Sequence, residues 1–169
     1  CIRDRLNNFG FTPKKPVIMS WSSGFEELIQ LDPAARENLI VGSNYYYTID
    51  NPENKKFVEA YKKKFKGVPP GYAGAAGYGL MKMTLLGMQK SGSTEPQKVI
   101  TALEEHKGKN FVGDFEIRGR NHQTVRPFFV LQTKKKNEMK NQYDMAEVVD
   151  VSSTEQPKNI NMCKDIGSF

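Results

Sequence analysis

The stretch PVIMSWSSG, residues 16–24, decides the fold because a short apolar run passes into a polar turn and then into a helix-like segment. This order predicts a strand at Val17–Met19, a turn and a helix. In open α/β sheets, ligands bind outside the carboxyl ends of the strands, where the free amides of a following helix accept anions. The turn holds the only tryptophan, Trp21, and is therefore a candidate ligand site. The alternative is an ordinary loop with Ser22 or Ser23 as N-cap.

The remaining pattern alternates helices and strands, which favours an α/β layered sheet over a helical bundle or a β-sandwich. Helices are expected at residues 25–31, 51–67, 72–90 and 94–103, and strands at residues 39–41, 113–117, 125–132 and 145–151. The clearest helix start is Asn51-Pro52-Glu53, with a capping residue, a proline at the first helical position and an acid near the positive end of the dipole. Thr94 and Gln97 are expected to form a capping box for the last helix.

The composition is that of an ordinary globular protein, with 38% hydrophobic and 26% charged residues in 169 positions. The formal charge is +6, with two clusters of lysines. Lysines 62–64 and Lys66 interleave with a helical apolar stripe, and lysines 134–136 lie in an expected turn. We therefore expect no nucleic-acid partner. No run approaches the roughly 20 apolar residues of a membrane span. Residues 1–6 resemble the middle of an amphipathic helix, so we expect the chain to be part of a longer protein.

Motifs for catalysis and cofactors are scarce. Neither histidine stands in a triad or metal spacing, and the turn at residues 20–24 lacks the first glycine of the nucleophile elbow. The glycines of residues 71–79 miss the dinucleotide fingerprint. Cys1 and Cys163 are too few for a metal site, which leaves a single disulfide or two free buried thiols. We expect no catalytic residue, no metal and no cofactor.

Three consecutive tyrosines, Tyr45, Tyr46 and Tyr47, lie between an expected strand and an expected helix. Because successive side chains of an extended segment face alternately, at least one ring can point into a crevice. An apolar ring with a polar tip suits a binding pocket. The alternative is that the rings pack as half-buried strand residues.

The succession of these features resembles one known family over about residues 1–133. The stretches that carry the resemblance are residues 17–24, 38–42, 57–65, 69–70, 73–78, 90–93, 99–103 and 111–115. In this order they are similar to the carboxyl-terminal half of the type I periplasmic solute-binding proteins of the leucine/isoleucine/valine-binding kind. Members of that family are receptors for ABC importers.

The resemblance implies a type I periplasmic-binding-protein fold, an α/β receptor with two Rossmann-like lobes that closes around a small ligand. On this pattern, residues 1–43 finish one lobe, residues 44–123 belong to the other lobe after a hinge crossover, and residues 124–169 cross back to the first lobe. The ligand-binding residues implied in this sequence are Trp21, Ser22, Ser23, Tyr45, Tyr46, Tyr47 and Tyr72.

The resemblance also implies ABC permease subunits as partners, a location in the periplasm or at the extracellular face of the membrane, and no catalytic activity. Because the family's tail returns to the lobe that holds the first helix, it further implies a disulfide between Cys1 and Cys163. The upstream half, which supplies most contacts to the ligand carboxylate in the family, is not in this sequence.

The ligand class is narrowed by a missing acid. In amino-acid-binding members, the turn that matches residues 20–24 carries an acidic residue that pairs with the ligand's ammonium, and here it has none. A buried ammonium without a charge partner costs several kcal/mol. An amino-acid-like ligand therefore needs an acid from elsewhere, while aromatic acids and amides stay open. A ligand-sensing regulatory protein of the same fold, such as an amide sensor, and an α/β enzyme with its catalytic residues outside this sequence are the alternatives.

Overall fold

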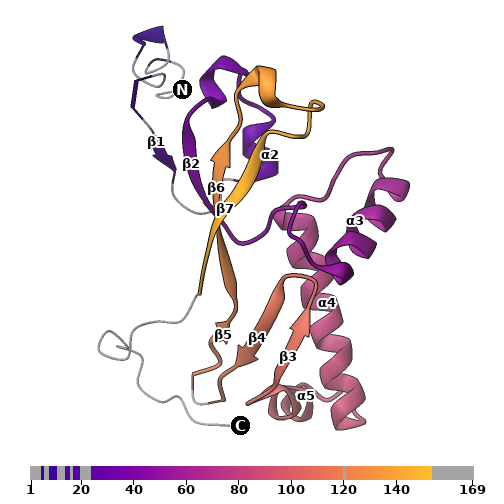
Figure 1. Cartoon of the computed structure of the whole chain (residues 1–169). Helices are drawn as coiled ribbons and strands as arrows, with labels where there is room; N and C mark the ends of the chain where they lie inside the picture. Colours follow the sequence, from indigo (N-terminus) through magenta and orange to yellow (C-terminus); the bar gives the residue numbers. More distant parts are fainter. Residues whose placement is uncertain are drawn as a thin grey trace.

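The computed structural model describes residues 5, 8–10, 14–15, 17–19, 24–119 and 121–153. Within these ranges, helices and strands are mixed along the chain. They are β1 (Val17–Met19), α2 (Phe25–Leu28), β2 (Leu39–Ser43), α3 (Pro52–Lys64), α4 (Tyr72–Ser91), α5 (Pro96–Leu103), β3 (Lys107–Asn110), β4 (Gly113–Ile117), β5 (Thr124–Val125), β6 (Pro127–Thr133) and β7 (Ala146–Ser153). The described part is elongated, with β1, β2 and β6 toward one end and β3, β4 and α5 toward the other (Figure 1).

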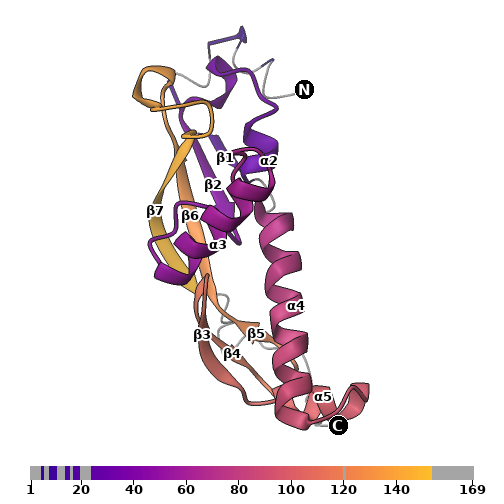
Figure 2. The same cartoon turned by 90° about the vertical axis from the view of Figure 1, so that its right-hand side faces the viewer.

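The strands form two sheets. The first has the order β1-β2-β6-β7, in which β1 and β2 are parallel and the other neighbours are antiparallel. The second is an antiparallel sheet of order β3-β4-β5. We call the first sheet with α2 the first unit, and the second sheet with α3, α4 and α5 the second unit. Figure 2 shows α4 running along the second unit, with α2 above its upper end.

The chain passes between the two units at two places in the described ranges. It leaves the first unit after β2 and enters the second at α3, through residues 44–51, which we call the crossover. It returns where β5 passes into β6 at Arg126, so that one extended stretch runs from the second sheet into the first (Figure 1). This architecture is the mixed α/β arrangement expected from the alternating sequence pattern.

The core of the first unit is built from alternate residues of β2 and β6. Leu39, Val41 and Leu131 are fully buried, because alternate side chains of a strand point to the same face. That face is covered by α2, which contributes Phe25 and Leu28. The helix is shorter than the expected span 25–31: it ends before Ile29, which is 40% exposed, since the chain turns there toward the break at Asp32-Pro33.

The core of the second unit is aromatic. The ring of Phe57 in α3 stacks on Tyr78 of α4 at 4.4 Å between centroids and packs against Phe111 at 5.2 Å. Phe111 lies in the two-residue turn between β3 and β4 and also contacts Tyr78, at 5.2 Å. Three elements that are distant in sequence therefore meet at one cluster of rings.

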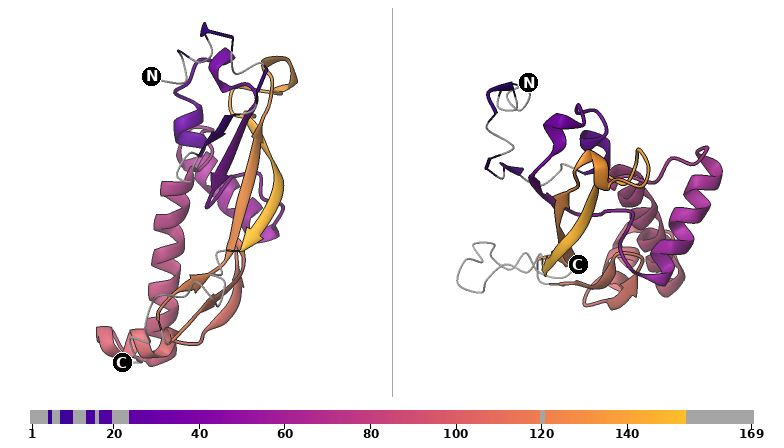
Figure 3. Two further views of the ribbon diagram at one scale, coloured as in Figure 1. Left: turned by 90° about the vertical axis from the view of Figure 1, so that its left-hand side faces the viewer. Right: turned by 45° about the horizontal axis from the view of Figure 1, so that its top comes forward.

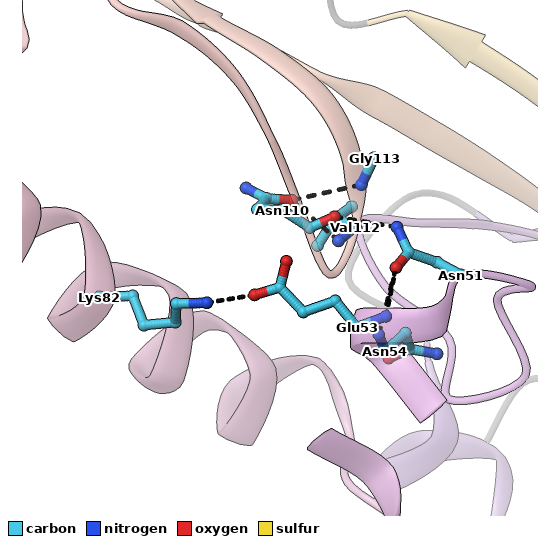
Figure 4. A network of polar contacts seen from close by, with 7 residues as sticks. All are labelled: Asn51, Glu53, Asn54, Lys82, Asn110, Val112 and Gly113. Atoms are coloured by element: carbon cyan, nitrogen blue, oxygen red, sulfur yellow. Dashed lines mark hydrogen bonds and ion pairs between the residues drawn. The ribbon is translucent and has the colours of Figure 1, made fainter. Parts of the chain in front are cut away.

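Asn51 ties the start of α3 to the β3–β4 turn (Figure 4). As expected from the sequence, its side-chain oxygen accepts the amide of Glu53 at 2.8 Å, and Pro52 occupies the first helical position. Its side-chain amide donates to the carbonyl of Asn110 at 2.9 Å, and Asn110 in turn accepts the amide of Val112 at 2.8 Å. Lys82 of α4 forms an ion pair with Glu53, which joins α4 to the same network.

The structure differs from the sequence predictions at three further points. The capping box of Thr94 and Gln97 is absent, because α5 begins at Pro96, so that Glu95 and not Thr94 is the N-cap, and Glu95 makes no side-chain cap bond. The strand β3 was not predicted, since its sequence Lys-Gly-Lys-Asn is polar and half exposed and shows no apolar alternation. The single strand expected at residues 125–132 is divided into β5 and β6, which pair in different sheets.

Replacement of Leu131 by alanine tests the first-unit core. Leu131 is fully buried, so the cavity and the lost apolar contact should lower the free energy of unfolding by about 2–5 kcal/mol in urea denaturation. Val149→Ala is the matched control, because Val149 on β7 is 52% exposed and its truncation should cost no more than about 0.5 kcal/mol. Equal losses for the two variants would contradict the assigned register of β6 and β7.

Candidate functional site

The candidate site lies where the parallel strands β1 and β2 end. Met19, the last residue of β1, pairs with Val41, and both strands run toward the same edge of the first sheet. Ser43 is the last residue of β2. Of the turn that follows β1 only Gly24 is described, where it is the N-cap of α2 in place of either serine. Trp21, Ser22 and Ser23 lie outside the described residues, as do Cys1 and Cys163.

Gly24 brings the turn, β2 and α4 together. A Cβ atom placed on Gly24 would lie 3.3 Å from Cδ1 of Tyr72 and 3.5 Å from Oγ of Ser43. Tyr72 is half-buried at the first position of α4. The negative charge of the nearby Glu27 carboxylate raises the pKa of the Tyr72 phenol. One of the predicted ligand-binding tyrosines thus lies against the end of the predicted ligand-binding turn.

Two carboxylates follow the turn, and both accept backbone amides. Oε2 of Glu27 accepts the amide of Gly24 at 2.7 Å, which fixes the start of α2. The two carboxylate oxygens of Glu26 accept the amides of Tyr72 and Ala73, each at 3.2 Å. The acids nearest the turn are therefore engaged with the protein's own backbone.

Tyr45 belongs to the core of the second unit. Its side chain is 2% exposed, its hydroxyl donates to Oδ1 of Asn54 at 2.8 Å, and its ring packs against Phe111 at 5.8 Å and Phe57 at 6.2 Å. Burial raises the pKa of its phenol above the ordinary range. Through its bond to Asn54, Tyr45 attaches the crossover to α3.

Tyr46 lies on the side of the first unit. It is 1% exposed, and burial raises the pKa of its phenol. The backbone of Ala146 at the start of β7 and the charges of Asp144 and Arg36 also act on that pKa, so the hydroxyl lies among residues of the first unit. Tyr45 and Tyr46 are therefore packed in different units, as expected for neighbouring residues of an extended segment, whereas the rings of Tyr46 and Tyr47 lie 5.0 Å apart.

Tyr47 is half-buried and contacts both units. Its hydroxyl donates to the carbonyl of Tyr143 at 2.8 Å, and its ring meets Phe25 of α2 edge-on at 6.0 Å. From the second unit, Nζ of Lys62 lies 5.4 Å from the centre of the ring, within the range of a cation–π contact. Burial raises the pKa of the Tyr47 phenol to about 12.

Asn54 was not identified from the sequence, although it fixes the crossover. It is fully buried, accepts the Tyr45 hydroxyl, and donates through Nδ2 to the carbonyls of Tyr47 at 3.1 Å and Ile49 at 2.9 Å. The signal available in the sequence was its position: Asn54 lies three and four residues before Phe57 and Val58, on the buried stripe of α3.

Two described cavities lie away from these tyrosines. One of about 650 Å³ lies between the second sheet and the end of β7, and its charged lining includes Lys107, Lys109 and Arg126. The two lysines are paired with Glu116 at 3.5 Å and Asp114 at 3.4 Å. The other cavity, of about 330 Å³, lies between α4 and the β3–β4 hairpin.

The family model for periplasmic binding proteins matches residues 4–138. The chain belongs to this family. Its members are substrate-binding receptors, and the mixed α/β structure has the type I periplasmic-binding-protein fold. A comparison with curated protein sequences found no match.

Solved structures give the same fold. An amino acid ABC transporter substrate-binding protein from Pseudomonas fluorescens is 26% identical, with a TM-score of 0.85 over 93% of this chain and 42% of that protein. A leucine-binding protein from Thermotoga maritima is 23% identical, with a TM-score of 0.71 over 89% of this chain and 40% of that protein. A solute-binding protein from Rhodopseudomonas palustris, solved with 3,4-dihydroxybenzoic acid, is 16% identical, with a TM-score of 0.69 over 94% and 49%. The chain thus spans less than half the length of each of these proteins.

The described part of the chain lacks both a metal-binding cluster and a membrane-spanning helix. In that part of the chain, no cluster of three or more His, Cys, Asp and Glu side chains is arranged to hold a metal ion. No helix there combines the length and the apolar composition needed to span a membrane.

The raised pKa of Tyr47 predicts a tyrosine ionisation that is lost when Tyr47 is replaced by phenylalanine. A phenol whose folded pKa is about 12 stabilises the protein at pH values below its unfolded pKa, about 10, and this contribution is lost as the pH rises through 12. Ultraviolet titration of tyrosinate should show one ionisation near pH 12 that is missing in Tyr47→Phe. The variant also loses the bond to Tyr143, so its melting temperature should fall at neutral pH. An unchanged titration curve would contradict the burial of this ring.

Proposed function

We propose that this chain forms the carboxyl-terminal half of an extracytoplasmic solute-binding receptor of an ABC importer. The observation that carries the proposal is the convergence of the β1 and β2 strand ends, the turn at Gly24 and the start of α4 beside a crossover between two units. Membership of the periplasmic binding protein family and the likeness to an amino acid ABC transporter substrate-binding protein support it. ABC permease subunits are the proposed protein partners.

The exposed apolar side of α4 supports the assignment to one half of a larger receptor. Leu80, Met81 and Leu85 are 72%, 61% and 56% exposed, although the helix is apolar around most of its circumference. A helix of this kind is normally covered on all sides. The matched structures extend well beyond the region that this chain covers, and we propose that the rest of the receptor covers this side.

Closure of two lobes about the crossover is the proposed mechanism. We assign residues 1–43 and 126–169 to one lobe and residues 44–125 to the other. The second boundary lies two residues after the expected one, because Thr124 and Val125 pair with β4 in the second sheet. Tyr45 and Tyr46 anchor the crossover to opposite units, and the half-buried Tyr47, which contacts both, is the crossover tyrosine placed to meet a ligand. Binding and closure require no covalent bond to be made or broken, so we propose no enzymatic activity.

The proposed ligand is a small aromatic acid or amide. The turn at residues 20–24 carries no acid, and the carboxylates of Glu26 and Glu27 already accept backbone amides, so the ammonium of an amino acid would have to share a carboxylate that the backbone engages. Trp21 in the adjacent turn would stack on an aromatic ring, at about 0.5–1.5 kcal/mol beyond area burial. The Rhodopseudomonas palustris protein shows that this fold accommodates an aromatic carboxylate.

A ligand screen tests the function. Full-length protein is heated with leucine, 3,4-dihydroxybenzoate or benzamide, and calorimetric titration follows for each compound that raises the melting temperature. A ligand at 100 times its dissociation constant should stabilise the protein by about 2.7 kcal/mol. We expect the aromatic acid or the amide to bind more tightly than leucine, and preferential leucine binding would contradict the proposed ligand class.

Two aromatic truncations test the site residues. Trp21→Ala and Tyr72→Ala should each weaken binding of the best compound by about 1–3 kcal/mol, roughly 5-fold to 150-fold, because each leaves an unfilled pocket. Tyr78→Ala is the matched control: this tyrosine is on the same helix as Tyr72, is 38% exposed and stacks on Phe57 away from Gly24. It should lower the melting temperature and leave the affinity unchanged. Normal affinity in both site variants would remove Trp21 and Tyr72 from the site.

A further inference from the structure

Glu26 forms a polar contact between the two units. It lies on α2 in the first unit, and its carboxylate reaches the amino end of α4 in the second unit, where it accepts the amides of Tyr72 and Ala73 at 3.2 Å each. Figure 2 and the left view of Figure 3 show this arrangement from opposite sides, with α2 beyond the end of α4. The two contacting segments are 46 residues apart in the chain.

The contact is electrostatically favourable. The first amides of an α-helix have no partner within the helix and form the positive end of its dipole. A carboxylate that accepts two of them makes charge-assisted hydrogen bonds, which are stronger than neutral ones. The N-cap of α4 is Gly71, which has no side chain to accept these amides. Glu26, from the other unit, takes the place of a local capping residue.

Gly71 leaves the space that the carboxylate occupies. A Cβ atom on this residue would lie 1.8 Å from Cδ and from Oε1 of Glu26. The φ angle of Gly71 is −91°, which any residue adopts, so glycine is required here by the carboxylate and not by the backbone. Any larger residue would force the Glu26 side chain away from the α4 amides.

We propose that Glu26 is a closure latch, a positioning residue that holds the two units together on the side of the candidate ligand site. The inference rests on the proposed function, in which the units open and close about the crossover. Separation of α2 from α4 must break both Glu26 bonds, whereas the contacts of Tyr45 with Asn54 lie within one unit and its crossover and survive opening. The latch lies beside Gly24 and Tyr72, so it strengthens closure where the ligand would be enclosed.

The test measures the distance between units in full-length protein without added ligand. Fluorescent donor and acceptor are attached through p-azidophenylalanine at Asn137 in the first unit and Gln97 on α5 in the second, both exposed positions. Glu26→Gln removes the charge, and Gly71→Ala displaces the carboxylate without changing it. Single-molecule energy transfer should show the ratio of closed to open molecules falling by about tenfold in each variant, in line with the loss of a charge-assisted hydrogen bond.

Glu59→Gln is the control, because it makes the same charge change at an exposed position of α3 and should leave the distribution unchanged. Circular dichroism confirms that each variant is folded, and Gly71→Ala stands alone as the test if Glu26→Gln is not. A wild-type distance distribution in every folded latch variant would overturn the latch. A different result would contradict the receptor function and leave the latch intact: the latch variants open the protein, but no compound of the ligand screen binds.

Discussion

A single buried amide, the side chain of Asn54, fixes the path of the chain between the two units. It accepts the Tyr45 hydroxyl and donates to two crossover carbonyls, so all three bonds hold the crossover to α3. An unsatisfied buried polar group costs about 1–3 kcal/mol, so loss of this side chain would leave several such groups without partners. Because Asn54 holds the crossover at one end, the proposed closure requires motion nearer to Tyr46 and β2.

The division of the three tyrosines follows from that constraint. Tyr45 is directed into the aromatic cluster of the second unit, so Tyr46 faces the other way and packs against the first. Tyr47 remains between them with its hydroxyl on Tyr143. Because adjacent residues are packed in different units, a short segment can act as a hinge while each unit keeps its core. Glu26 adds two hydrogen bonds between α2 and α4, and neither bond belongs to the apolar core of a unit.

The sequence predicted the elements whose signals are local. Apolar runs marked β1 and β2, and the Asn51-Pro52 start of α3 was found because capping depends on neighbouring residues. The sequence did not predict β3, whose polar residues are held in a hairpin by pairing with β4. Glu26 gave no signal, because its partners are 46 residues away and only the fold brings them together. Asn54 could have been found, since a polar residue on an apolar stripe indicates a buried hydrogen bond.

Small-angle X-ray scattering of the full-length protein, with and without a saturating ligand, tests the central claim most directly. If two units close about the crossover, a ligand that raises the melting temperature should also lower the radius of gyration, because closure brings the units together. A ligand that binds tightly and leaves the radius of gyration unchanged would contradict the account, since the crossover would then be a fixed connection and not a hinge.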